Sequence, residues 1–421
     1  MAEEYIIGLD LNKYEAQLCR YDAGKDDAES VMVTAGGSRE SFPARLAYLP
    51  ADEKWKYGIE ADYFIAHKGA LRVDDVFGIA SGAKETELDG KIFSPEFILS
   101  KFIALSLTSA GITDPKEELL SLVVTAPAIT REFAETAEKA FAILGLDGRR
   151  SQIMDHAESF FFHTFYQKID IKNRDAALYY FPDEYTVSFL SIGENSQTKP
   201  ITVFPKVRGE QVLPFEPDER DAAFLDFIKE TTSRGEYSAA FLVGSGFDRS
   251  WSRESLAQLC RGKRKVFYGN NLFAKGACFA ALDRSGDTKL KDVLYIGSDL
   301  VTENIGMEML IDGEPGYKPL IRAGVNWYKA KNEIEFILND ERDVIFRTSS
   351  MTDGIRRKFR MTLPELPVRP PKMTRLRLSI KYEEAGKCVI TVADMGFGEF
   401  CPSSGLTWTE TLKERHAEER G

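Results

Sequence analysis

The sequence predicts an α/β protein of two or three domains, in which mixed α/β layers are followed by an all-β domain. A chain of 421 residues is too long for one ordinary hydrophobic core. Before about residue 284, hairpins alternate with strand–helix units, which is typical of α/β layers rather than of a purely parallel series. From there to about residue 410, short extended runs and turns recur, with a Pro-rich stretch at 363–376.

Local patterns predict the elements of the first part. Pro95 after Ser94 marks the start of an amphipathic helix, and Gly145 marks the end of another. The first expected elements are a hairpin at 5–22, extended runs at 31–50, helices at 58–77 and 94–112, and a strand, turn and helix at 119–147. A strand and an aromatic helix at 150–169 follow, then a hairpin at 175–192, a helix at 218–233, and strand–turn–helix units at 237–260 and 263–282.

Composition excludes several classes of protein. The net charge of −11 argues against a general nucleic-acid binder, which needs a basic face, although it leaves room for a local basic patch. The acidic start MAEEYIIG is neither a signal nor a transit peptide, and no apolar run approaches the roughly 18 residues of a membrane span. Four histidines and five scattered cysteines without CxxC spacing favour reduced thiols in the cytoplasm and no metal site.

Six segments follow one another in a recognisable order: YIIGLDLNKYEAQL, SLVVTAPAITREFAETAEKAFAILGL, IMDHAESFFFHTF, ALYYFPDEYTVSFLSI, AAFLVGSGFDRSW and NNLFAKGACFAAL. Together they resemble the 70-kilodalton heat-shock chaperones of the DnaK type, in the actin-like ATPase clan. The second segment is the most specific, with a Val-rich strand, a Pro turn and a long helix. Further on, DVLYIGSDLVTENIGMEML is similar to that family's interdomain linker and first sandwich strands, and FRMTLPELPVRPPKMTRLRLSIKYEEAGKCVITVADMGFGEF to its later strands.

The resemblance implies an actin-like ATPase fold of duplicated ribonuclease H-like domains, followed by a β-sandwich. We expect a shortened nucleotide-binding domain at 1–284, a linker at 285–291, a sandwich resembling a peptide-binding domain at 292–410 and a charged tail at 411–421. Only about fifty residues separate Ile192 from Phe241. Since the family places a whole additional subdomain in this interval, most of the lid over the adenine base is expected to be missing.

The first half of the family's ATP site is partly retained. The carboxylate of its first phosphate hairpin falls on Asp10, but Lys13 and Tyr14 stand where the family has threonines. Lys13 could attract a phosphate or be a solvated residue of the hairpin tip. The adenosine turn, LVGSGFDRS, keeps Gly244 and Gly246, which serve either close approach of a nucleotide or packing alone.

The second phosphate hairpin is lost. Phe181, Pro182 and Asp183 fall on the family's glycines, and Glu184 on its threonine. Proline has no N–H to donate to a phosphate, and the two carboxylates oppose an anion. The lysine that would orient the attacking water falls on Val76.

His156 falls on the family's helix-start glutamate. An imidazole there could act as a general base, because its ordinary pKa lies near neutrality. The alternative is a histidine at the start of an aromatic helix with a purely structural role. Asp10 and His156 are therefore the two catalytic candidates.

The β domain suggests peptide binding by an extended segment along apolar pockets. The candidate lining residues are Ile305, Met307, Met309, Phe336 and Leu338. The alternative is that these side chains form the sandwich's own core. The basic run at 354–361 is either a docking face or a strand edge protected by its charges.

The sequence thus predicts a chaperone-like scaffold that binds a protein or peptide partner and has a degenerate ATP site, without enzymatic activity or cofactor. The alternative is an active ATP-dependent chaperone, with ATP and magnesium held by Asp10, Lys13, Asp183 and Glu184. A sugar or acetate kinase of the same clan fits less well, because the β domain has no place there. No nucleic acid or membrane is expected as a partner, and the sequence does not specify the oligomeric state.

Overall fold

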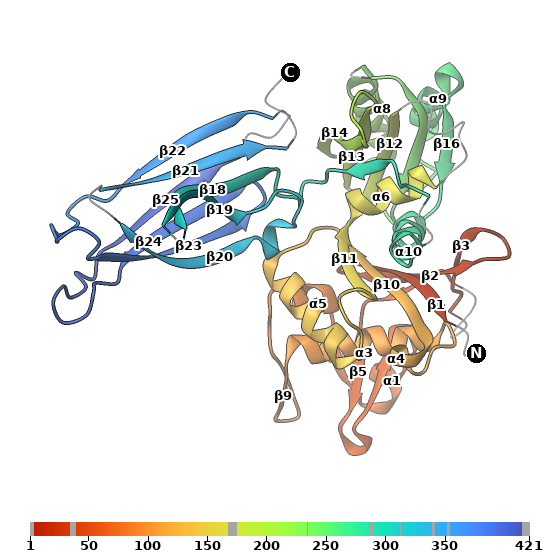
Figure 1. The fold of residues 1–421 in the computed structure, drawn as a ribbon. Coiled ribbons are helices and arrows are strands. Elements are labelled where there is room, and N and C mark those ends of the chain that lie inside the picture. The colour runs from red at the N-terminus through yellow and green to blue at the C-terminus, as the bar shows by residue number, and fades with distance from the viewer. Residues whose placement is uncertain are drawn as a thin grey trace. The chain divides into compact units, whose positions relative to one another are not determined.

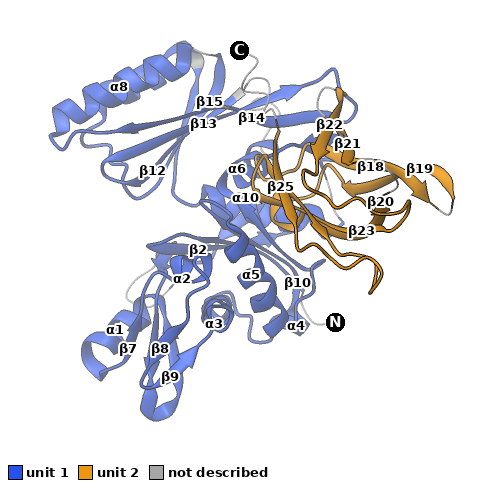
Figure 2. Cartoon of the chain, turned by 90° about the vertical axis from the view of Figure 1, so that its left-hand side faces the viewer, with its two compact units in different colours: residues 1–297 blue, residues 298–421 orange. Residues whose placement is uncertain are grey.

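A computed structural model of the protein describes residues 4–33, 39–166, 175–233, 235–286, 289–311, 313–338, 342–351 and 354–414 (Figure 1). The chain divides into two compact units, Met1–Gly297 and Ser298–Gly421 (Figure 2). In the described part of the chain, no helix combines the length and the apolar character needed to cross a membrane.

The first unit begins with a sheet whose strand order is β11-β10-β1-β2-β3. The strands β1, β2 and β3 form an antiparallel meander, whereas β10 and β11 run parallel to β1. The bounds are β1 Tyr5–Leu11, β2 Glu15–Asp22, β3 Asp27–Ser30, β10 Leu119–Ala126 and β11 Ser151–Asp155, with β4 Ser41–Pro43 also paired to β2. The hairpin expected at 5–22 is confirmed.

Between β4 and β10 the chain forms a smaller layer of short elements. The helix expected at 58–77 is wrong in its second half, because Gly69 adopts a left-handed φ of 66° and Leu71–Val73 pairs with β5 instead. The elements are β5 Leu46–Leu49, η1 Pro50–Asp52, β6 Lys54–Tyr57, α1 Gly58–Lys68, β7 Leu71–Val73, α2 Val76–Ser81, β8 Thr86–Leu88, β9 Lys91–Phe93, α3 Pro95–Thr108 and α4 Pro115–Glu118.

A second sheet repeats the topology of the first. Its order is β16-β15-β12-β13-β14-β17, with β12, β13 and β14 as an antiparallel meander and β15 and β16 parallel to β12. The bounds are β12 Asp175–Asp183, β13 Thr186–Asn195, β14 Ile201–Val212, β15 Tyr237–Val243, β16 Lys265–Tyr268 and β17 Val293–Tyr295. This repetition is what a duplicated ribonuclease H-like domain requires, and the actin-like assignment itself stays a prediction.

Two helices, α6 (His156–Phe165) and α10 (Leu272–Arg284), lie between the two sheets (Figure 1). Helix α10 packs closely on both α6 and β1. A Cβ on Gly276 of α10 would lie 2.0 Å from the carbonyl oxygen of Ser159 on α6, and a Cβ on Gly8 of β1 would lie 2.2 Å from the amide nitrogen of Cys278 on α10. One hydrophobic core therefore joins both sheets through these helices. Further helices of the described residues are α5 Arg131–Ile143, α8 Pro217–Ser233, α9 Arg253–Leu259 and η2 Arg261–Lys263.

The first unit extends further along the chain after α10 than the sequence predicted. Strand β17 pairs in parallel with β14, and the ring of Tyr295 stacks on Phe161 at 4.6 Å. The boundary therefore lies at Gly297 and not at 291, because these apolar residues complete the edge of the second sheet. Residues 287–288 of the expected linker lie outside the described residues.

The second unit contains two four-stranded antiparallel sheets, ordered β19-β18-β21-β22 and β20-β23-β24-β25. Alternating residues of β21 and β23 are buried, as expected for sheets that each cover one face of a core. The bounds are β18 Glu303–Ile311, β19 Glu314–Ile321, η3 Trp327–Lys329, β20 Lys331–Leu338, β21 Asp343–Ser350, β22 Arg356–Thr362, β23 Thr374–Glu384, β24 Lys387–Asp394 and β25 Thr407–Lys413.

The charged tail starts later than the sequence suggested. Residues 411–413 belong to β25, and Glu414 is buried. Its carboxylate accepts hydrogen bonds from the backbone and hydroxyl of Thr302 and from the Tyr382 hydroxyl, so a buried acceptor anchors the chain here. Residues 415–421 lie outside the described residues.

Candidate functional site

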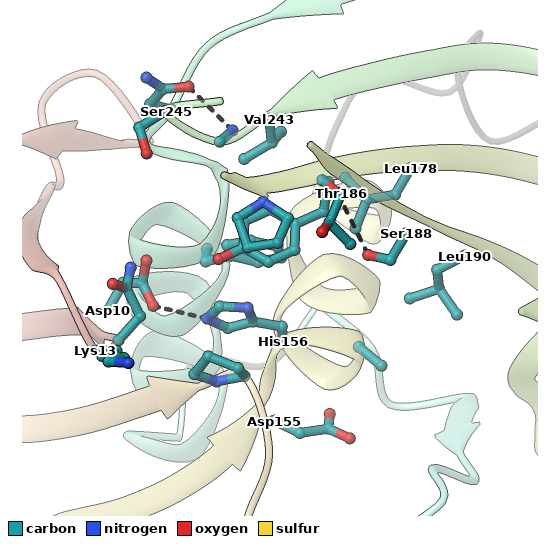
Figure 3. A pocket seen from close by; sticks show the side chains of 18 of the residues that line it. Asp10, Lys13, Asp155, His156, Leu178, Thr186, Ser188, Leu190, Val243 and Ser245 are labelled. Atoms are coloured by element: carbon teal, nitrogen blue, oxygen red, sulfur yellow. Dashed lines mark hydrogen bonds and ion pairs between the residues drawn. The ribbon is translucent and has the colours of Figure 1, made fainter. Parts of the chain in front are cut away.

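A cleft of about 690 Å³ opens between the two sheets of the first unit (Figure 3). The β1–β2 hairpin contributes one wall, and β12, β13 and the turn after β15 contribute the other. The start of α6 and the start of α10 close the cleft between them. The cleft thus brings together four of the predicted residues, Asp10, Lys13, His156 and Gly244, from three separate parts of the chain.

Asp10 and His156 form a buried pair inside the cleft (Figure 3). The distance from Nε2 of His156 to Oδ1 of Asp10 is 2.8 Å, and the two residues are 7% and 4% exposed. When Asp10 is ionised, Nε2 of His156 is protonated and donates the hydrogen bond to Oδ1 of Asp10. The pair arises because β1 ends at the same edge of the sheet as β11, whose last residue, Asp155, caps α6 by accepting from the Glu158 amide.

Aromatic side chains hold this imidazole in place. The ring of Phe273 stacks on His156 with the centroids 3.7 Å apart and the planes 10° from parallel. Tyr180 meets the same imidazole edge-on at 5.5 Å. The imidazole therefore has little freedom to turn away from Asp10.

Glu15, Gln17 and Tyr180 are polar residues that line the cleft together with this pair. Burial raises the pKa of the Glu15 carboxyl, a hydrogen bond with Ser41 opposes this, and the charge of Asp10 adds to it. The pKa of Tyr180 is also raised, by burial first and then by Asp10 and Glu15. Gln17 is 3% exposed, and its Oε1 has no hydrogen-bond partner within the described ranges. A triphosphate next to this pair would meet the Asp10 carboxylate and Oε1 of Gln17, whereas the cations of the cleft lining are Lys13 and Arg208.

The β12–β13 turn does not form a phosphate-binding loop. Phe181 is fully buried against Phe224 and Phe247, and only Pro182 of the turn lines the cleft. Asp183 Oδ1 accepts from the Tyr185 amide and so closes the turn on itself. Asp183 and Glu184 lie outside the cleft lining, so the structure does not bring them to Asp10 and Lys13.

The two glycines of the turn after β15 permit close packing on β12. A Cβ at Gly244 would lie 2.0 Å from the carbonyl oxygen of Phe181, and one at Gly246 would lie 1.8 Å from that of Asp183. The Gly244 amide donates to Oδ1 of Asn270, and the Gly246 amide to the Phe181 carbonyl. Gly246 lies outside the cleft lining. The geometry therefore accounts for both glycines by packing alone.

The structure places the two remaining positions of the expected ATP site differently, Lys13 in the cleft lining and Val76 in the interior. Lys13 is exposed at the cleft mouth, with Nζ 5.3 Å from the ring centroid of Tyr14. Val76, at the position of the family's lysine, is fully buried. In the described ranges, no group of three or more His, Cys, Asp or Glu side chains is arranged to hold a metal ion.

The peptide-binding candidates of the second unit are mostly interior. Ile305, Met307 and Phe336 are buried, whereas Met309 and Leu338 are half-buried. A peptide could reach the first three only if the sandwich opened. They correspond to the core that the strand alternation had suggested as the alternative.

Sequence reasoning missed Glu15, Gln17, Tyr180 and Phe273 as residues of the cleft. Gln17 pairs with Asp10 across the β1–β2 ladder, and Glu15 lies two residues before it on the same side of the strand. This two-residue spacing opposite Asp10 was a usable signal. Tyr180 and Phe273 had none, because only the tertiary fold brings them to His156.

The fold and cleft can be compared with known families. Residues 27–298 match the family model described as "Family of unknown function (DUF5716) C-terminal", which covers more than half of the 421 residues. The chain belongs to this family. In this DUF5716 member, residues 300–413 also match a model described as "Domain of unknown function (DUF8552)", so the two matches meet near the unit boundary at Gly297. No curated protein matches the chain. The β1–β2 hairpin with Asp10 precedes the DUF5716 match.

Proposed function

We propose that this DUF5716 member is a chaperone-like interaction scaffold, which binds a protein or peptide partner and whose actin-like cleft neither binds nor hydrolyses ATP. One observation carries the proposal: Asp10, the carboxylate that the resemblance assigns to a metal-bound phosphate, is buried against His156 at 2.8 Å. The imidazole engages Oδ1 of this carboxylate, so that oxygen already has a hydrogen-bond partner within the protein. Magnesium also coordinates oxygen ligands in strict octahedral geometry, which a neighbouring imidazole and Phe273 do not supply.

The neighbouring surfaces support the same conclusion. Pro182 cannot donate to a phosphate, and the amides of Gly244 and Gly246 already donate within the protein. If the closed turn, the paired Asp10 and the valine at position 76 each remove about 1–3 kcal/mol of binding free energy, ATP affinity falls by roughly two to six powers of ten. A total loss of more than about 4 kcal/mol would move a micromolar nucleotide site beyond the millimolar range.

The scaffold part of the proposal is supported by architecture. The repeated sheet topology of the first unit and the two-sheet second unit follow the order expected for a shortened relative of the DnaK type. The cytoplasm is the proposed location, since all five cysteines are free thiols.

Calorimetric titration of the full chain with magnesium and ATP tests the proposal. We expect no binding heat up to about millimolar nucleotide, and no phosphate release above that of an Asp10→Asn variant. Asp10→Asn is the matched control because an amide at this position keeps the shape of the side chain and removes its charge. Micromolar binding, or hydrolysis that disappears in Asp10→Asn, would refute the proposal and favour the active chaperone.

A further inference from the structure

The second unit has a recess of about 740 Å³ on the outer face of the β19-β18-β21-β22 sheet. Its basic residues are Arg322, Arg347, Arg356, Arg357 and Lys358, and its acidic residue is Glu308. Its volume lies within the roughly 300–1,000 Å³ of ordinary ligand sites. This recess is separate from the buried peptide-binding candidates discussed above.

The basic side chains converge because of strand alternation. Phe346 and Thr348 are buried, so Arg347 between them projects from the opposite face of β21. On β22 both Arg356 and Lys358 are exposed, and Lys358 lies directly opposite Arg347 in the ladder. Like charges at facing positions repel each other and cost stability. An anion over the recess would relieve this repulsion.

Little in the protein neutralises these charges. Glu308 pairs with Arg347 at 2.6 Å, and Arg357 pairs with Glu303 at 3.6 Å from the other side of the strand. Within the described residues, Arg356, Lys358 and Arg322 have no ion pair, and Nε of Arg347 is buried without a hydrogen-bond partner. The recess therefore keeps a net positive charge in a chain whose net charge is −11.

The recess also has an apolar side. The ring of Tyr317 lies over Gly306, where an added Cβ would be 2.4 Å from the ring, and Pro319 and Ile321 continue this wall. Glycine at 306 thus lets an aromatic ring lie flat on the sheet. A ligand that fills the recess must present negative charge to β21 and β22 and apolar groups to β19.

We infer that this recess binds an acidic peptide segment of a protein partner, in which carboxylates alternate with apolar side chains. The inference rests on the proposed function as a scaffold and specifies the chemistry of the partner. A peptide fits better than a nucleic acid, since the chain's overall negative charge repels a long polyanion whereas a short acidic segment experiences chiefly the local field. Strand β22 lies at the edge of its sheet. Its cations repel the same strand of a second copy of the protein and attract an acidic peptide strand.

The test uses the full chain and a fluorescein-labelled peptide of about ten residues in which Glu and Val alternate. Fluorescence anisotropy should show binding that weakens with added salt, and the same peptide with Gln for Glu should bind at least about tenfold more weakly. The double variant Arg356→Gln with Lys358→Gln should lose at least about tenfold in affinity for the Glu peptide. Lys381→Gln, an exposed lysine on β23 outside the recess, should bind as the wild type does.

Three results would overturn the inference: equal binding of the Glu and Gln peptides, an equal loss in Lys381→Gln, or tighter binding of a labelled single-stranded oligonucleotide of the same charge. The last result would assign the recess to nucleic acid. If the double variant unfolds at a lower temperature than the wild type, the single variant Arg322→Gln serves the same comparison from the β19 end. Titration with ATP tests the cleft of the first unit, whereas titration with the peptide tests the recess of the second unit. The proposed function and the inference about the recess can therefore fail independently of each other.

Discussion

Gly246→Ala tests whether the turn after β15 is built for packing. The added Cβ would lie 1.8 Å from the carbonyl oxygen of Asp183 and 2.1 Å from its carbonyl carbon. Both atoms belong to the main chain of β12, which pairs with β13 on one side and β15 on the other. No side chain can rotate away to make room, so the backbone itself must move by more than about 1 Å.

The cost follows from what that movement breaks. Forcing an extra methyl into a packed interior costs about 1–3 kcal/mol, and loss of the hydrogen bond from the Gly246 amide to the Phe181 carbonyl adds about 1 kcal/mol. We therefore expect the free energy of unfolding of the first unit to fall by about 2–4 kcal/mol. At about 2–4 °C per kcal/mol, its Tm should fall by roughly 5–15 °C.

Differential scanning calorimetry of the full chain measures this shift, with Gly269→Ala as the matched control. Gly269 lies in the neighbouring loop, and the nearest atom to its added Cβ is Oδ1 of Asn271 at 3.8 Å. This control should change the Tm by no more than about 1–2 °C. A Gly246→Ala protein as stable as the control would show that the turn does not pack on β12, and the packing explanation of the glycines would fail.

Three further predictions concern stability. Asp394→Asn should destabilise the second unit by about 3–5 kcal/mol in urea unfolding, because Arg369, whose side chain is 5% exposed, donates two hydrogen bonds of 2.7 Å to this carboxylate and would lose its counter-charge and one of these bonds. Burial alone would raise the pKa of Asp394, but hydrogen bonds from Arg369, Ser404 and Gly396 outweigh it and hold the pKa well below its ordinary value. The stabilisation by this carboxylate is therefore complete above about pH 4 and is lost as the pH falls further. The difference in free energy of unfolding between the wild type and Asp394→Asn should therefore become smaller below about pH 4. Burial lowers the pKa of His163 to about 3, so the unfolded chain takes up a proton that the fold excludes, and stability should fall as the pH drops below about 6.5. His163→Leu should remove that part of the pH dependence, and an unchanged slope would contradict it. Glu414→Ala should lower the Tm of the second unit, with an expected loss of about 2–4 kcal/mol, because it leaves the Thr302 and Tyr382 donors without their acceptor.

The sequence by itself determined the elements whose signals are local. Apolar runs around Asp10, the buried run at Leu119–Ala126 and the Pro-initiated helix after Ser94 all appear where they were predicted. Each depends on period, caps and turn residues within one window of the chain. The same local chemistry identified Pro182 as unable to bind a phosphate.

Only the tertiary structure decided which of these residues meet. His156 reaches Asp10 across 146 residues, and Phe273 then stacks on it, because two parallel strands end at one edge of the sheet and α10 crosses beneath them. Likewise, β18 and β22 alternate in a pattern that fits either face, and only pairing in the second unit buried Met307 and exposed Lys358. Periodicity specifies that a strand has two faces, but which face becomes the core depends on what packs against it.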